Sequence, residues 1–312
     1  MIVLLACSAL ALLLVPGVAA RWGRQLPPAE WARLATTAVL GGAVMFEVSL
    51  LLLAAPTVAR AAGTTPLASI CHHLMGTLAP GGPVMGWIAA AAAAWLGVRA
   101  FLSIVRSRRT THVARSLSAA GSCHRRQGVE TIVVPAQQPM AVSVPGRRPI
   151  VLLTSGLVRA LSEREVTAVV RHEEAHIRHR HHRYIAALAT IEAALGGVPF
   201  VRTSVSGVRL ALERWADEEA AGSDPQTRAD VRSALLRTAE AMVAAPSVAA
   251  FSTPGMVAER VKALEAPAGH ASRQPGLLYG LMAAGAAAVL VSLGGWVGQV
   301  HVVATLSGLC RI

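Results

Sequence analysis

The sequence predicts a mainly α-helical membrane protein with four transmembrane helices and a cytoplasmic α+β domain between the third and the fourth. The first observation is composition: of 312 residues, 54% are hydrophobic and only 15% are charged, an apolar excess typical of membrane spans. The second is spacing, because the apolar runs leave one block of domain size, residues 106–276. The third is charge, since a formal net charge of +12 is carried almost wholly by Arg, as in loops on the inner side of a membrane.

Four apolar runs are long enough to cross about 30 Å of hydrocarbon. We expect the spans at residues 1–20, 34–59, 84–105 and 277–304. No basic residue precedes the first run, and Arg21 and Arg24 follow it. We therefore interpret it as a retained span and not as a cleaved signal peptide. Residues 277–312 would hold the fourth span and a short outer tail.

The basic residues after the third span set the orientation. They are Arg106, Arg108, Arg109 and Arg115. Because positively charged loops stay inside, we expect residues 106–276 in the cytoplasm and both chain termini outside the cell membrane. The same charges favour contact with anionic lipid headgroups. No aromatic residues interleave them, so nucleic acid is not expected as a direct partner. Oligomer formation stays open.

Two pairings are candidates for tying the membrane region together. Glu47 lies in the second span, where a carboxylate is costly; either its neighbours in the bundle satisfy it or it pairs with Arg99. Cys71 and Cys310 are expected on the oxidising outer side and Cys123 in the cytoplasm. A disulfide between Cys71 and Cys310 is one expectation, and two unpaired thiols are the other.

The cytoplasmic block begins with strands and continues with helices. Strands are expected at residues 131–134, 140–144 and 150–153, which Pro and Gly residues separate. Ser162 and Glu165 form a capping box, so a helix begins at Ser162. Residues 185–201 are apolar, but Gly196, Gly197 and Pro199 favour a core or membrane-resting helix over a span. Further helices are expected at residues 229–245 and 254–264, followed by a linker at residues 266–275.

Residues 172–176 read His-Glu-Glu-Ala-His and fit the H-E-x-x-H pattern of zinc sites. His172 and His176 stand one turn apart on one helix face, so both imidazoles can reach one ion. Glu173 then lies beside the open position of the metal, where it can act as general base. The alternative is a solvated basic face, because three more His follow closely. They are His179, His181 and His182, and we expect them to face solvent or lipid headgroups; donation of a hydrogen bond to the oxyanion is the alternative.

A second element supplies what the pentapeptide lacks. A catalytic zinc site takes three protein ligands and leaves one position open. Glu213 can be the third ligand from a second helix. Asp217, one turn further on, can hydrogen-bond the free ring nitrogen of a ligating His. The two elements together predict a hydrolase that binds one zinc ion. The strand at residues 140–144 is the candidate for aligning a peptide substrate by edge pairing.

In this arrangement of spans and zinc motif, the chain resembles the sensor-transducer membrane metallopeptidases of the BlaR/MecR type. The resemblance covers most of the chain and rests on residues 159–165, 172–178 and 213–217. It implies a gluzincin in which His172, His176 and Glu213 bind zinc. Glu173 would be the base and Asp217 would support a ligand. It also implies a protein substrate in signal transduction, a cytoplasmic winged-helix transcriptional repressor.

Two other interpretations stay open. Antibiotic sensors of the BlaR/MecR type carry an outer penicillin-binding domain, whereas this chain has no S-x-x-K sequence, so β-lactam acylation is not expected of it. The chain is also similar to HtpX-type membrane zinc proteases, which degrade damaged membrane proteins, although those place two spans before the zinc helix. A non-catalytic membrane receptor with structural zinc is the third interpretation, and Glu173 argues against it because a structural site needs no base.

Overall fold

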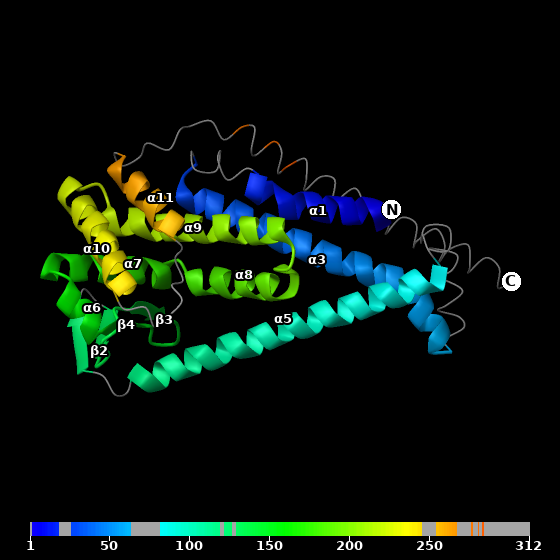
Figure 1. Cartoon of the computed structure of the whole chain (residues 1–312), viewed down its shortest axis with the longest axis horizontal. Coiled ribbons are helices and arrows are strands. Elements are labelled where there is room, and N and C mark those ends of the chain that lie inside the picture. Colours follow the sequence, from blue (N-terminus) through cyan, green and yellow to red (C-terminus); the bar gives the residue numbers. More distant parts are fainter. Residues whose placement is uncertain are drawn as a thin grey trace.

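The computed structural model describes residues 2–18, 26–63, 82–118, 122–126, 129–244 and 254–266, and the single residues Gly276, Gly280 and Ala283. This part of the chain is mainly helical (Figure 1). The helices that run along the long axis are α1 (Ile2–Val18), α3 (Pro28–Ala61), α5 (Gly82–Ser118), α8 (His181–Leu195) and α9 (Pro199–Ala221). A small sheet and the remaining helices gather at one end of this bundle.

Two of these helices are long and apolar enough to cross a membrane. They are α3 and residues 82–113 of α5, which include the expected second and third spans. The 17-residue α1 is apolar but shorter and corresponds to the expected first span. The fourth expected span, residues 277–304, lies outside the described ranges. The number of membrane crossings therefore stays a prediction.

The expected pairing of Glu47 with Arg99 is not found. The guanidinium of Arg99 lies 5.6 Å from the ring centre of Trp95, one turn earlier on the same helix. Among the described residues, no ion pair joins Arg99 to Glu47. A cation–π contact within one helix therefore takes the place of the interhelical ion pair that we considered.

A helical hairpin, α8 and α9, packs along the apolar helices. The single helix expected over residues 185–201 is wrong, because α8 ends at Leu195 and α9 begins at Pro199. Pro at the first turn of a helix costs no hydrogen bond, whereas Pro inside a helix does. Buried apolar side chains of α1, α3, α8 and α9 form one cluster, to which Leu13, Val39, Leu188 and Val205 belong. The hydroxyl of Ser204 donates to the carbonyl of Leu13 at 2.6 Å.

The sheet is mixed and has the order β1-β2-β4-β3. Its strands are β1 (Ser122–Arg126), β2 (Val129–Val134), β3 (Ala141–Val144) and β4 (Ile150–Thr154). β2 pairs with β4 in parallel, and β3 pairs with β4 antiparallel. β3 is therefore an edge strand. The three expected strands are found within one or two residues of their predicted bounds, while β1 was not predicted.

Four helices complete the end of the molecule that holds the sheet. They are α6 (Ser155–Ala160), α7 (Glu163–Arg178), α10 (Pro225–Ala244) and α11 (Pro254–Glu265). Val166 and Val170 of α7 pack on Val151 and Leu153 of β4. A separate apolar cluster joins α7 to α9, α10 and α11. The sheet and α10 thus hold α7 against α9, and this packing brings the two predicted site elements together.

Candidate metal centre

Helix α7 is fixed at its start by the capping box that the sequence predicts. The hydroxyl of Ser162 accepts from the backbone N–H of Glu165 at 3.4 Å, and the Glu165 carboxylate accepts from the backbone N–H of Ser162 at 2.7 Å. The valines of α7 face the sheet. His172 and His176 lie on a neighbouring face of the helix, where they contact Glu213 and Asp217 of α9.

The structure brings His172, His176 and Glu213 together. One ligand atom from each lies within 4.8 Å of the other two. The two Nε2 atoms of the histidines are 3.1 Å apart, and the Glu213 carboxylate lies 3.4 Å from His172 Nε2 and 3.6 Å from His176 Nε2. Tetrahedral ligands about 2.0–2.1 Å from a zinc ion stand about 3.3 Å from one another. The donor set and its spacing therefore fit one zinc ion.

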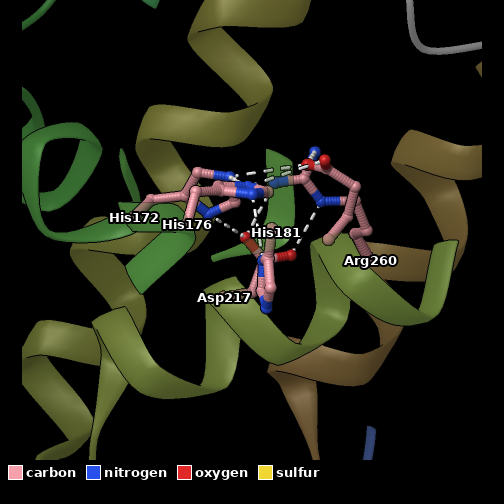
Figure 2. Close-up of polar contacts among 6 residues, drawn as sticks. His172, His176, His181, Asp217 and Arg260 are labelled. Carbon is pink, nitrogen blue, oxygen red and sulfur yellow. Dashed lines mark hydrogen bonds and ion pairs between the residues drawn. The ribbon is translucent and has the colours of Figure 1, made fainter. Parts of the chain in front are cut away.

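Asp217 lies behind His172, as expected of a residue that supports a metal ligand. Its Oδ1 atom is 2.9 Å from His172 Nδ1 (Figure 2), whereas Glu213 lies against the other ring nitrogen, Nε2. Asp217 is only 2% exposed. Glu213 and Asp217 are one turn apart on α9, so the spacing of the two acidic residues places both carboxylates beside α7.

Glu173 lines a cavity of about 230 Å³ beside the cluster. Glu173 is half-buried, and its carboxylate is found in no hydrogen bond within the described part of the chain, although its charge acts on His176 and Arg260. Its carboxylate is therefore available to a molecule in the cavity. The other walls are largely apolar and include Met140, Ala141, Leu157, Val169, Leu235, Met242 and Val257. The edge strand β3 and the residue before it thus border the same space as the predicted base.

His181 is not solvated, contrary to the sequence-based expectation for the three additional histidines. It is fully buried, and its Nδ1 atom lies 3.0 Å from Nδ1 of His176 (Figure 2). Arg180 has φ 55°, the only positive φ of a non-glycine among the described residues. This left-handed residue ends the helical path of α7 and turns His181 back toward His176. Helical periodicity alone could not predict that contact. His179 is partly buried against Trp215, and His182 is half-buried.

Arg260 of α11 is the site residue for which the sequence contains no signal. Its Nε and Nη2 atoms donate to the two oxygens of Asp217, both at 2.7 Å (Figure 2). Its Nη1 atom lies 3.1 Å from Oε2 of Glu213. Helix α11 was predicted, but its position depends on how α9, α10 and α11 pack. One Arg among many could not be assigned to the site from the sequence.

The buried charges shift the titration of several groups. Burial disfavours the charged form of His172, yet hydrogen bonds to Asp217 and Glu213 raise the pKa of this ring to about 10. Burial alone would raise the pKa of both carboxyl groups, but Arg260 and His172 hold the pKa of Glu213 and of Asp217 below the ordinary values. Burial and the neighbouring His176 ring lower the pKa of His181 to about 3. Binding of a metal therefore has to displace a proton from His172.

The cluster lies next to the end of a long apolar helix. The Arg33 guanidinium of α3 is 4.9 Å from the ring centre of Trp215 on α9. The Trp215 ring in turn lies 4.7 Å from the ring of His181 and 4.5 Å from that of His179. The metal cluster and the start of α3 are thus separated by only two layers of side chains. Cys71 and Cys310 lie outside the described residues, and their pairing stays a prediction.

One comparison with known proteins found a match to part of the chain. Residues 104–212 match the family model described as Peptidase family M48. The match includes His172, Glu173 and His176 and ends one residue before Glu213. No curated protein and no solved structure matches the chain.

Proposed function

We propose that this chain, a zinc metalloendopeptidase of peptidase family M48, is tethered to the cell membrane and makes site-specific cuts in cytoplasmic proteins. The observation that carries the proposal is the His172–His176–Glu213 cluster, which opens onto an apolar cavity bordered by the edge strand β3. The two long apolar helices support a membrane location. The basic residues that follow the span in α5 favour a cytoplasmic site.

We assign the roles of the site residues as follows. His172, His176 and Glu213 hold the zinc ion, and Asp217 orients His172 through its Nδ1 atom. When bound, zinc polarises the scissile carbonyl and makes water at its open position more acidic. Glu173 accepts a proton from the attacking water and then donates it to the nitrogen of the leaving amine. This transfer needs a carboxylate that lines the cavity, as that of Glu173 does.

The edge strand β3 can position the substrate. Its pairing with β4 leaves its other edge open within the described sheet. An extended peptide that adds to this edge would run past Met140 and Ala141 along the cavity that holds Glu173. The backbone of the substrate would then be held by main-chain hydrogen bonds, and its apolar side chains would enter the cavity.

The substrate that we propose is a transcriptional repressor of the winged-helix kind, cut during signal transduction. Its identity rests on the resemblance to BlaR/MecR-type peptidases. Quality control of membrane proteins is the second candidate. One observation favours it: only Trp215 and the neighbouring His rings separate the cluster from the start of α3. A site so near the membrane can reach chains that emerge from the bilayer.

The Glu173→Gln variant tests the activity and separates the two candidates. It removes the base and keeps all metal ligands, so we expect unchanged zinc content and a loss of peptide cleavage. Protein fragments are compared by mass spectrometry in cells that carry wild type or Glu173→Gln. A single repressor-sized protein that loses its cleavage product supports signalling. Broad accumulation of misfolded membrane proteins, with every repressor unchanged, supports quality control. Cleavage at the wild-type rate by the variant would contradict the mechanism.

A further inference from the structure

Two carboxylates stand one turn apart on α9, and both contact His172. Glu213 and Asp217 are four residues apart, and like charges at this spacing repel each other. Asp217 is almost fully buried, and the Glu213 side chain is 27% exposed. Burial strengthens their repulsion because little water screens it. A site that holds both carboxylates is therefore stabilised by a cation that reaches both.

Arg260 is such a cation, and it contacts the two carboxylates through three separate nitrogen atoms. Nε and Nη2 form a bidentate pair with Asp217, and Nη1 contacts Glu213. Arg260 is only 8% exposed, so its contacts are shielded from solvent. The planar guanidinium fixes the angle between these contacts, whereas the single ammonium of Lys cannot make all three.

We propose that Arg260 is a positioning residue of the metal centre, which sets the orientation of Asp217 and Glu213 at once. The Oδ1 atom of Asp217 accepts a hydrogen bond from Arg260 Nη2 and lies 2.9 Å from His172 Nδ1. The guanidinium therefore fixes the carboxylate that orients His172. Nη1 lies 3.1 Å from Oε2 of Glu213, the oxygen that also lies 3.4 Å from His172 Nε2. Helix α11 therefore contributes to the zinc site although no residue on it binds the metal. This inference rests on the zinc site of the proposed protease.

A purely structural role for Arg260 would be the docking of α11 onto α9. The chain contains a second arginine that provides this docking without touching the site. Arg228 of α10 donates to both oxygens of Glu218 at 2.8 and 2.9 Å, and also to the carbonyls of Ala263 and Leu264 at the end of α11. It is as buried as Arg260, at 8% exposure. Glu218 is the neighbour of Asp217 in the sequence. Arg228 is therefore a matched control for Arg260.

The experiment measures zinc affinity of the full-length protein in detergent, by competition with a chromophoric chelator. We expect Arg260→Gln to weaken zinc binding roughly 10–100-fold, the usual loss when a group that supports a metal ligand is removed. Arg260→Lys is expected to bind zinc at least about 10-fold more weakly than wild type. Lys keeps the positive charge but cannot make the bidentate contact with Asp217. Arg228→Gln is expected to lower the melting temperature and to leave zinc affinity within about twofold of wild type.

A double-mutant cycle with Asp217→Asn tests whether Arg260 acts through Asp217. In that background Arg260→Gln should weaken zinc binding much less than it does in wild type, since the partner is already changed. Zinc affinity within twofold of wild type in Arg260→Gln would overturn the proposal. Wild-type zinc affinity in Arg260→Lys would also overturn it. So would a loss of zinc affinity in Arg228→Gln as large as that in Arg260→Gln. Because these readouts report metal binding, they stay distinct from the loss of cleavage in Glu173→Gln that tests the protease itself.

Discussion

At the scale of single residues, the metal centre combines groups with unequal roles. His172, His176 and Glu213 present donors to one point, while Asp217 contacts the other ring nitrogen of His172 and the guanidinium of Arg260. A ligand contributes a bond to the metal, but a supporting residue contributes only orientation and ligand basicity. Replacing a ligand should therefore cost more zinc affinity than replacing its support.

The first residue-scale prediction compares the two carboxylates of α9. We expect Glu213→Ala to abolish stoichiometric zinc binding, whereas Asp217→Ala should weaken it about 10–100-fold. Metal content after dialysis and chelator competition measure the two effects. A Glu213→Ala protein that binds zinc as tightly as wild type would show that Glu213 is not a ligand.

The second residue-scale prediction concerns Glu165, the buried carboxylate of the capping box. Burial would raise its pKa, but hydrogen bonds from Ser233 and Ser162 and the charge of Arg237 lower the pKa of Glu165 overall. A lowered pKa in the folded state means stabilisation that is present above the pKa of the unfolded chain, near 4.3, and that is lost as the pH falls through the folded-state pKa.

We therefore expect Glu165→Gln to unfold more easily than wild type at pH 7, by about 1–3 kcal/mol, and this difference to shrink below about pH 4. Thermal unfolding in detergent at several pH values measures it. Glu163→Gln, at an exposed position in the same helical turn, is the control and should change stability little. A constant difference between Glu165→Gln and wild type at every pH would contradict the pKa assignment.

The sequence predicts residues whose contacts are local and misses those that depend on packing. His172, Glu173 and His176 follow from helical spacing alone, and Glu213 and Asp217 from the same rule on a second helix. His181 depends on the left-handed conformation of Arg180, which non-glycine residues rarely adopt. Arg260 depends on the docking of α11. The positions of His181 and Arg260 in the site therefore could not be predicted from the periodicity of the sequence.

At the scale of elements, the same distinction explains the strands and the hairpin. The apolar strands were predictable because their side chains alternate or form buried runs. β1 reads Ser-Cys-His-Arg-Arg and carries no such pattern; it forms by pairing with β2. The break between α8 and α9 coincides with Gly196, Gly197 and Pro199, signals that argued against a span but also mark a turn.

The hairpin of α8 and α9 is expected to enter the bilayer beside the spans. Its apolar side chains share one cluster with α1 and α3, and Ser204 contacts a carbonyl within α1. In a variant whose native cysteines are replaced by Ser, Gly197→Cys at the tip should react slowly with a water-soluble maleimide. Arg183→Cys, near the start of α8, should react rapidly. Equal rates at the two positions would place the hairpin in water.

At the scale of the whole molecule, the prediction concerns orientation. We expect Ala62 to lie outside the cell and Arg148 to lie inside, because the basic residues that follow the span in α5 favour the cytoplasm. Both positions are exposed. In the same Ser-substituted background, Ala62→Cys in intact cells should react with a membrane-impermeant maleimide, and Arg148→Cys should react only after lysis. The reverse pattern would place the metal site outside and exclude a cytoplasmic substrate.

The continuous helix α5 runs from the expected third span directly to the sheet. Its 37 residues span about 55 Å at about 1.5 Å per residue, well beyond the ~30 Å of hydrocarbon. Arg115 near its end donates to the carbonyl of Pro145, in the turn that follows β3. A small tilt of so long a helix displaces its end considerably, because a 10° tilt of a rod about 55 Å long moves its far end by about 10 Å. Helices tilt to match the thickness of the surrounding bilayer, so a change of membrane thickness around the expected span of α5 would displace the helix end that contacts the turn after β3.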